Sequence, residues 1–302
     1  MALTSEFAVD VLCVGHACYD LIFTVDHHPA ADEKGTASAF YSCGGGPAAN
    51  AAVAVSRLGL RAAFAGYLGE DVFGQRHFAE LQAEGVDTRF VAMGVRPTPL
   101  SVVLVKPDGR RSLINYREAT DPLAVGRIDF DGCRPGVILC DGHEPHVSLA
   151  LAQKARKTAI PVVLDAGSLH EGTRQLLPLA DYVVASQKFA CQLTRTTDMD
   201  RALDILGRIA PQLVITMGER GLLWKLGRTG GRLPAFRIEA ADTTGAGDAF
   251  HGAFAAGLAA GRPWKNLLSY ASAAAALCCT RNGARLGLPT AQMVDALMQT
   301  HT

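Results

Sequence analysis

The chain reads ADTTGAGDAFHGAF from Ala241 to Phe254, a loop of small residues that runs into a helical segment. The first backbone N–H groups of a helix have no intrahelical acceptor and lie at the positive end of the helix dipole, so they favour phosphate oxygens. Gly245 and Gly247 let the backbone approach such an anion without a Cβ atom in the way. The stretch therefore predicts an anion site at Gly245, Ala246 and Gly247.

Asp248 lies at the start of the same helix, and its position permits two interpretations. The first interpretation is structural, because Asp is a preferred N-cap residue. The other is phosphoryl transfer, in which a carboxylate takes the proton of the attacking hydroxyl. The chain has no Gly-x-x-x-x-Gly-Lys-Ser/Thr motif, so the amides of 245–248, a magnesium ion and a basic side chain would have to neutralise the phosphates. His251 follows on about the same helical face, where we expect it to pack beside the loop.

Short apolar strands alternate with helical segments along most of the chain. Residues 9–15 form the first strand, and 48–58 form a helix with Pro47 at its start and Gly59 just past its end. The segments that continue the alternation are a strand at 62–69, a helix at 71–84 and apolar strands at 137–141, 161–165, 182–185 and 213–216. Apolar strands separated by helices predict an α/β fold with a parallel sheet covered on both faces.

Polar residues mark the edge of that sheet where a ligand is expected. Open parallel sheets bind ligands at the C-terminal ends of their strands. Four residues lie at or just past the ends of strand-like segments: Asp20, Asp141, Asp165 and Thr216. Residues 100–105 and 111–116 flank a Pro107-Asp108-Gly109 turn and predict a β-hairpin. We therefore expect one α/β domain with a small β extension.

The composition argues against several classes of function. Lys plus Arg and Asp plus Glu number 29 each among 302 residues, so no global field favours nucleic acid or an anionic membrane. The eight cysteines form no CxxC pair, which is typical of reduced thiols rather than of a zinc site. No apolar run is long and uninterrupted enough to span a bilayer. We expect a cytoplasmic enzyme that meets anionic ligands locally.

Two signatures resemble the ribokinase-like (PfkB) family of carbohydrate kinases. The family's C-terminal signature, Asp-Thr-x-Gly/Ala-x-Gly-Asp before a helix of small residues, is matched at every position by 242–248. Its N-terminal signature, a Gly-Gly pair with Asn a few residues on and a helix ending in Arg-x-Gly, is matched by 45–50 and 57–59. The resemblance covers nearly the whole chain. It implies a three-layer αβα sandwich with a mostly parallel central sheet and a small β-sheet lid, with 1–302 as one kinase domain.

The resemblance also implies roles for individual residues. Asp248 would be the base that activates a sugar hydroxyl, beside the backbone of Gly245, Ala246 and Gly247. The implied sugar subsite comprises Asp20, Gly45, Gly46 and Asn50, and the implied nucleotide-binding residues are Thr216, Gly218, Gly221, Thr243 and Asn282. Asp242 and Thr244 would hold a monovalent cation such as potassium, while ATP and Mg²⁺ are the implied co-substrate and cofactor. The lid, expected at about 27–43 and 98–118, would cover the sugar and form a homodimer interface.

Within the family, the chain looks most like the 6-deoxy-6-sulfofructose kinases, and ketohexokinases are similar but more distant. In the former, a Lys from the lid, an Asn from the hairpin and an Arg after a central strand bind the sulfonate. Lys34 and Asn115 lie at matching positions, whereas His143 stands where the Arg is expected. We take His143 as the candidate sugar contact. The family's Asn-x-x-Glu, which helps to organise magnesium, is replaced by 186–189, Ser-Gln-Lys-Phe. We therefore expect magnesium to be held mainly through water.

Several alternatives stay open. Ribokinase, 2-keto-3-deoxygluconate kinase and nucleoside kinase belong to the same family. The spacing Gly44-x-Gly46-x-x-Ala49, with Glu70 and Asp71 about twenty residues on, superficially matches a dinucleotide fingerprint and would predict an NAD(P)-dependent dehydrogenase. The fingerprint needs a strand immediately before the glycines, and small polar residues precede them here. A non-catalytic nucleotide-binding protein is the third alternative, favoured only by the replaced Asn-x-x-Glu.

Overall fold

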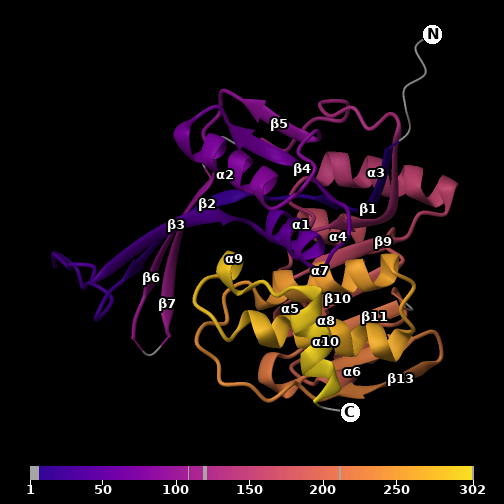
Figure 1. Ribbon diagram of the computed structural model, residues 1–302. Helices are drawn as coiled ribbons and strands as arrows, with labels where there is room; N and C mark the ends of the chain where they lie inside the picture. Colours follow the sequence, from indigo (N-terminus) through magenta and orange to yellow (C-terminus); the bar gives the residue numbers. More distant parts are fainter. Residues whose placement is uncertain (1–6, 108, 118–120, 211, 301–302) are drawn as a thin grey trace, which may run out of the picture.

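A computed structural model describes residues 7–107, 109–117, 121–210 and 212–300, which are organised by two β-sheets (Figure 1). The larger sheet has nine strands in the order β13-β12-β11-β10-β9-β8-β1-β4-β5. Its strands are β1 Phe7–Val14, β4 Ala62–Gly69, β5 Val91–Gly94, β8 Cys133–Cys140, β9 Val162–Ala166, β10 Tyr182–Ser186, β11 Gln212–Thr216, β12 Leu222–Leu226 and β13 Thr229–Leu233. Neighbours from β5 to β11 pair in parallel, whereas β12 and β13 add an antiparallel hairpin at one edge.

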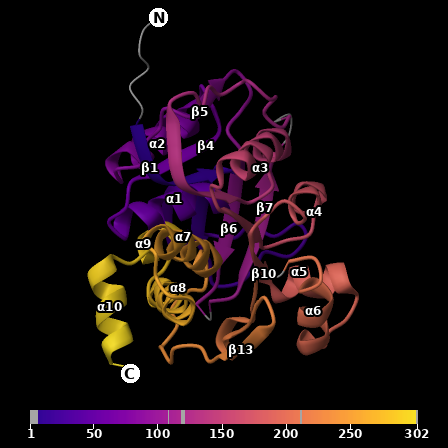
Figure 2. The same ribbon diagram turned by 90° about the vertical axis from the view of Figure 1, so that its right-hand side faces the viewer.

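Helices cover both faces of this sheet, so the predicted three-layer α/β architecture is confirmed (Figure 2). One face carries α1 Pro47–Arg57, α2 Val72–Ala83, α7 Ala246–Ala259, α8 Trp264–Cys278 and α10 Ala291–Gln299, whose apolar side chains share one core. The other carries α3 Pro145–Thr158, α4 Glu171–Leu176, α5 Gln187–Thr194 and α6 Met199–Leu206. Buried alanines of α1 and Gly252 of α7 let these two helices approach closely. This contact brings residues of the two sequence signatures together.

The smaller sheet has four strands in the order β3-β2-β6-β7 and projects from one side of the larger sheet (Figure 1). Its strands are β2 Cys18–Thr24, β3 Ala39–Gly45, β6 Leu100–Val105 and β7 Arg111–Tyr116. The pair β6-β7 is the predicted hairpin, although Asp108 of its turn lies outside the described residues. We refer to this sheet as the lid sheet.

One expectation about the lid sheet was wrong, and one of its inner strands was not predicted. Asp20 lies inside this strand, β2, rather than past the end of a strand of the parallel sheet. Within the expected lid segment 27–43, residues 34–38 form a loop and the strand β3 begins at Ala39. The physical reason is that β2 pairs with β6, about eighty residues further along the chain, so no local pattern identifies its partner.

The composition predicted reduced thiols and no segment that spans a bilayer. All eight cysteines are free thiols, and five of them are buried. None of the helices in the described part of the chain has the length and apolar character needed to cross a bilayer.

Candidate active site

The loop of small residues at 241–245 leads directly into α7. Gly245 is the N-cap, with φ 78° in the left-handed region, and the first intrahelical bond runs from Ala249 N to Gly245 O at 2.8 Å. The amides of Gly247 and Asp248 therefore lie in the first turn, at the positive end of a 14-residue helix. This geometry fits the predicted anion site.

Asp248 does not serve as the cap of this helix, because Gly245 holds that position. Its Oδ2 instead accepts a 2.7 Å hydrogen bond from Asn50 Nδ2 of α1, 198 residues away. Burial raises the pKa of Asp248 to about 7, and the Asp165 and Asp20 carboxylates act in the same direction while the bond from Asn50 opposes them. A carboxyl group that titrates near neutrality suits general-base chemistry.

Asp20 belongs to a polar row that crosses the lid sheet. It pairs in register with Cys43 of β3 and Ser101 of β6, and Ser101 pairs with Asn115 of β7. Directly paired residues project to the same face, and Ser101 Oγ donates to Asn115 Oδ1 at 3.0 Å. Gly45 is required beside this row, since a Cβ there would lie 2.3 Å from Asp20 Oδ2. The structure thus joins Asp20, Gly45 and Asn115, and it adds the buried Ser101, which the sequence patterns did not indicate.

The remaining residues of the implied sugar subsite, Gly46 and Lys34, occupy different structural positions. Gly46 is the N-cap of α1, with φ 96°, and its carbonyl accepts from Asn50 N at 2.8 Å, so it positions the helix that carries Asn50. Lys34 is exposed in the loop between β2 and β3. Among the described residues no hydrogen bond or ion pair connects Lys34 to the polar row, so its role stays a prediction.

His143 lies in a cluster of ring side chains just past β8. Its ring stacks on His170 with centroids 4.4 Å apart and lies 5.3 Å from the ring of His16. Arg117, one residue past β7, places Nη1 3.5 Å from His143 Nδ1. The lid hairpin therefore places a guanidinium beside His143, the residue that stands where the resemblance implies an arginine. Because the two residues are far apart in sequence, their spacing could not indicate this.

His251 makes polar contacts in addition to the packing we expected. Its Nδ1 lies 2.6 Å from Gly247 O, and its Nε2 lies 3.1 Å from Val184 O and 3.2 Å from Asp165 Oδ1. Burial raises the pKa of Asp165, and the charge of His251 partly offsets this. The buried pair thereby ties the first turn of α7 to β9 and β10, which restrains the helix start that carries Asp248.

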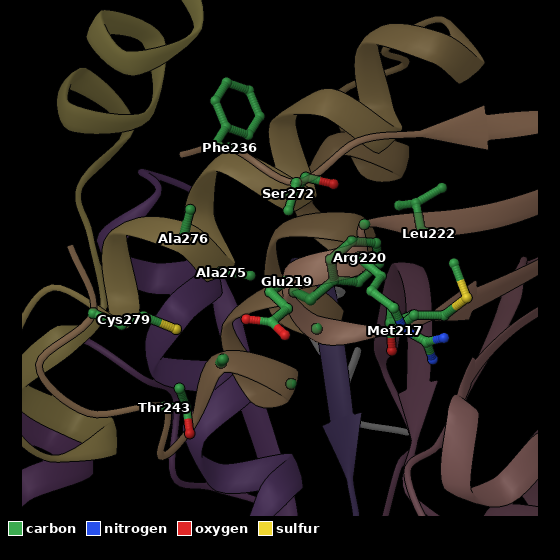
Figure 3. Close-up of a pocket in the computed structure, with 18 of the residues that line it drawn as sticks. Met217, Glu219, Arg220, Leu222, Phe236, Thr243, Ser272, Ala275, Ala276 and Cys279 are labelled. Carbon is green, nitrogen blue, oxygen red and sulfur yellow. The ribbon is translucent and has the colours of Figure 1, made fainter. Parts of the chain in front are cut away.

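A cleft of about 940 Å³ runs from the end of β11 along α8 to the anion loop (Figure 3). The lining residues that were predicted as nucleotide contacts are Thr216, Gly218, Gly221 and Thr243. Ala246 and Gly247 also line the cleft, so it opens onto the α7 amides. Its apolar wall, formed by Phe236, Ala275 and Ala276, suits a flat aromatic base. Asn282 lies on an exposed turn outside the lining, and its role stays a prediction.

The segment that replaces Asn-x-x-Glu lines the same cleft. Ser186 is the N-cap of α5 and accepts from Phe189 N at 3.0 Å, while Gln187 accepts from Arg220 Nη2. Lys188 and Arg220 both line the cleft and supply positive charge. Phe189 stands at the Glu position, so the segment lacks that carboxylate, and Lys188 beside it is a candidate for the basic side chain that the phosphates need.

The implied metal ions fit the described residues unequally. No group of three or more His, Cys, Asp or Glu side chains in the described part of the chain is arranged to hold a metal ion. Mg²⁺ usually keeps several waters and binds phosphates with one or two carboxylates, and Glu219 offers one carboxylate in the cleft. That donor set fits Mg²⁺ carried in by a nucleotide.

The implied potassium site has less support. Asp242 Oδ1 accepts from Thr244 N at 2.8 Å and from Thr244 Oγ1 at 2.6 Å, and Asp242 Oδ2 accepts from Gly283 N at 2.8 Å. Arg111 Nη1 also donates to Thr244 Oγ1 and lies 3.9 Å from Asp242 Oδ1. Hydrogen-bond donors and a guanidinium therefore already satisfy this carboxylate. The potassium site at Asp242 and Thr244 stays a prediction from the resemblance.

The geometry does not support a dinucleotide fingerprint at 44–49. Gly44 and Gly45 end β3, an antiparallel strand of the lid sheet, rather than a strand of the parallel sheet. Asp71, which would have met a ribose, instead caps α2 by accepting from Phe73 N at 3.0 Å and Gly74 N at 2.8 Å. Neither the glycine spacing nor the acidic residue therefore supports the dehydrogenase interpretation.

Comparisons with known proteins identify the family and the fold of the chain. A family described as pfkB family carbohydrate kinase matches residues 9–291. The ribokinase of Bacillus subtilis is 27% identical over 297 residues, which are 96% of this chain and 99% of the relative. Among solved structures, the fructokinase of Xylella fastidiosa with bound ATP has a TM-score of 0.81 and 27% identity, covering 97% of this chain and 98% of the other. The ribokinase of Arabidopsis thaliana complexed with ribose and ATP has a TM-score of 0.84 and 25% identity, covering 97% and 99%.

Proposed function

The chain belongs to the pfkB family of carbohydrate kinases, and from this premise we propose that it transfers the γ-phosphoryl group of ATP to a hydroxyl of a small sugar. The observation that carries the proposal is Asp248, a carboxyl group with a pKa of about 7 in the first turn of α7, beside backbone amides at the anion site. We treat 1–302 as one kinase domain whose lid is the four-stranded sheet.

The reaction follows from the positions of these groups. Asp248 takes the proton of the sugar hydroxyl as that oxygen forms a bond to the γ-phosphorus, and the bond from the γ-phosphorus to the bridging oxygen breaks to release ADP. The amides of Gly247 and Asp248 stabilise the negative charge on the transferred group. Lys188 and Arg220 offset charge from the other side of the cleft. Mg²⁺, entering with ATP, would neutralise phosphate oxygens.

We further propose a ketohexose or a ketohexose derivative with an anionic group, such as 6-deoxy-6-sulfofructose, as the sugar. The support is the cluster of Arg117, His143 and His170, in which a guanidinium lies beside stacked imidazoles, together with Asn115 in the polar row of Asp20. A guanidinium suits a sulfonate or phosphate better than an imidazole does. Ribose, 2-keto-3-deoxygluconate and nucleosides are the alternative substrates within the family.

A substrate screen tests this proposal. ADP release would be measured with ketohexoses, their 6-phosphates, 6-deoxy-6-sulfofructose, ribose, 2-keto-3-deoxygluconate and nucleosides. We expect the best kcat/KM for an anionic ketohexose, and in Arg117→Leu we expect its KM to rise about tenfold or more because a charge-assisted hydrogen bond is lost. The KM for the neutral ketohexose should change little. Preference for ribose or a nucleoside would contradict the sugar assignment. If no substrate in the screen causes ADP release, a non-catalytic nucleotide-binding protein is favoured.

The pH dependence of turnover tests the base. Because burial and nearby carboxylates raise the pKa of Asp248 to about 7, the carboxylate form that accepts a proton predominates only above that pH. We therefore expect kcat/KM for the sugar to rise with pH through about 7 and to level off above it. The measurement is kcat/KM between about pH 5.5 and 9 at saturating ATP. A profile that is flat across neutrality, or that falls with pH, would contradict the assignment.

We also infer a homodimer that forms through the lid sheet. Four apolar or aromatic side chains on β3 and β7 are exposed: Phe40 by 57%, Leu113 by 49%, Ile114 by 65% and Tyr116 by 45%. These side chains lie on the two outer strands of the lid sheet, and exposed apolar groups on edge strands are costly in water and suit a second copy of the chain.

A further inference from the structure

Arg285 of the short helix α9 Ala284–Gly287 is a buried arginine directly behind the base. It is 4% exposed, its Nε donates to Asn50 Oδ1 at 3.1 Å and its Nη2 lies 3.1 Å from His77 Nε2. Its Nη1 is buried without a hydrogen-bond partner, and the ion pairs of the described residues do not include Arg285. Neither sequence signature includes it.

These contacts decide how the amide of Asn50 is oriented. A guanidinium only donates hydrogen bonds, so the atom of Asn50 that faces Arg285 must be the oxygen. The NH₂ group of Asn50 then faces Asp248 Oδ2, 2.7 Å away, where it donates to the ionised carboxylate. A reversed amide would place two acceptors together at Asp248 and two donors together at Arg285. Arg285 therefore excludes the orientation of Asn50 that would disfavour the charged base.

His77 of α2 holds the other end of the guanidinium. Its ring is fully buried, and burial together with the charge of Arg285 lowers the pKa of His77 well below its usual value. The neutral ring accepts from Arg285 through Nε2 and keeps its proton on Nδ1. The guanidinium is thus fixed between Asn50 and a neutral imidazole.

This arrangement is a poor device for stability. Burial lowers the pKa of Arg285, and the charges of Cys43, Glu80, Glu84 and Asp20 offset this only in part. A buried cation without a direct ion pair is costly, and a hydrophobic side chain of similar length often replaces such a group without loss of stability. The buried Nη1 of Arg285, which has no hydrogen-bond partner, adds to the cost. A functional role explains their presence better than packing does.

We propose that Arg285 is a positioning residue of the kinase: by donating to Asn50 Oδ1 it holds the Asn50 amide group against Asp248 and keeps the base in its charged, proton-accepting form. The inference rests on the proposed function for the role of Asp248, but the orientation of Asn50 can be tested without turnover.

Other titratable groups also face Asp248 and must be held constant in the test. They are Cys18 and Asp20 of β2, Asp165 of β9, His251 of α7 and Cys278 of α8. None of them contacts Arg285 through a described hydrogen bond, although burial raises the pKa of Cys18 and of Asp20 and the charge of Arg285 lowers it in part. The hydrogen-bonded route from Arg285 to Asp248 runs through Asn50, and the Asn50→Ala arm of the test separates this route from the effect of the charge.

The experiment is a double-mutant cycle of Arg285→Met and Asn50→Ala in the full chain. The titration of Asp248 would be followed by ¹³C NMR of labelled aspartate carboxyl groups, assigned with Asp248→Asn, and the pH profile of kcat/KM would be measured in parallel. We expect Arg285→Met to raise the pKa of Asp248 by about one unit, the size of one lost hydrogen bond to a charged group, and to shift the acid limb of the profile equally. Asn50→Ala should give the same shift, and the double variant no further shift.

Two further variants separate positioning from structural loosening. Arg57 anchors the same segment, since its Nη1 donates to Arg285 O and Leu288 O at 2.9 Å each, but it does not contact Asn50. Arg57→Met should therefore lower thermal stability without moving the titration of Asp248. Arg285→Lys, which retains a donor, should recover part of the shift even if Arg285→Met folds poorly.

The outcomes distinguish the two proposals. An unchanged Asp248 titration in Arg285→Met, or shifts that add in the double variant, would overturn the role of Arg285. If the NMR titration of Asp248 shifts but none of the sugars causes the protein to release ADP, the positioning role of Arg285 stands and the proposed function is contradicted instead.

Discussion

Asp248→Asn is expected to lower sugar-dependent ADP release by about 10²–10⁴-fold while leaving ATP affinity nearly unchanged. The asparagine has the same shape, and its oxygen can still accept the bond from Asn50 Nδ2, so the start of α7 should keep its structure. What it loses is the ability to take up a proton. The measurements are kcat at saturating ATP and sugar, and the ATP dissociation constant by calorimetry.

A matched control carries the same change on a surface helix. Asp295 of α10 pairs with Arg262, with Asp295 Oδ1 3.5 Å from Arg262 Nη2. Because it is far along the chain from the anion loop, Asp295→Asn should retain full turnover. Asp248→Asn turnover within tenfold of the wild type would mean that the phosphoryl acceptor loses its proton elsewhere. Loss of ATP binding together with turnover would point to collapse of the loop rather than to loss of the base.

Local sequence chemistry predicted the main α/β elements because each is specified within its own window. The helix 48–58 has a proline at its start and a glycine past its end, and the structure places α1 at Pro47–Arg57 with Gly59 at φ 87°. The lid strand β2 was not predicted from the sequence, because it follows β1 after only three residues, where a parallel α/β pattern calls for a helix. Its strand character depends on hydrogen bonds to β3 and β6, which no short window contains.

The same distinction separates the residues of the site. The glycines of the anion loop could be predicted because their function depends on their own backbone. The role of Asp248 could not be decided locally, since the cap and the base interpretations differ only in what the carboxylate contacts, and that contact is Asn50, 198 residues earlier. Arg117 lies beside His143 and Arg285 donates to Asn50, and only the tertiary structure brings these pairs together.

Gly245→Ala is expected to disable the anion site and to destabilise the protein as well. Gly245 has φ 78°, where an alanine costs about 1–2 kcal/mol. A Cβ there would lie 2.5 Å from Ala284 Cβ and 2.7 Å from Ala284 Cα, and backbone atoms cannot give way as a flexible side chain can. The loop must therefore move, which withdraws the α7 amides from the phosphates. We expect kcat/KM for ATP to fall about 10²–10³-fold, the usual cost of losing a pre-oriented donor to developing charge.

Gly261→Ala isolates the backbone strain from the collision. Gly261 has φ 69°, close to that of Gly245, but a Cβ there would meet nothing within 4 Å, and it lies at the far end of α7. It should lose about 1–2 kcal/mol of stability, measured by thermal denaturation, and keep its kinetics with ATP. Gly245→Ala should lose more, because the strain and the collision with Ala284 add. If Gly245→Ala instead kept its kcat/KM for ATP within about threefold at a temperature where it is folded, the α7 amides would not be the groups that stabilise the transferred phosphate.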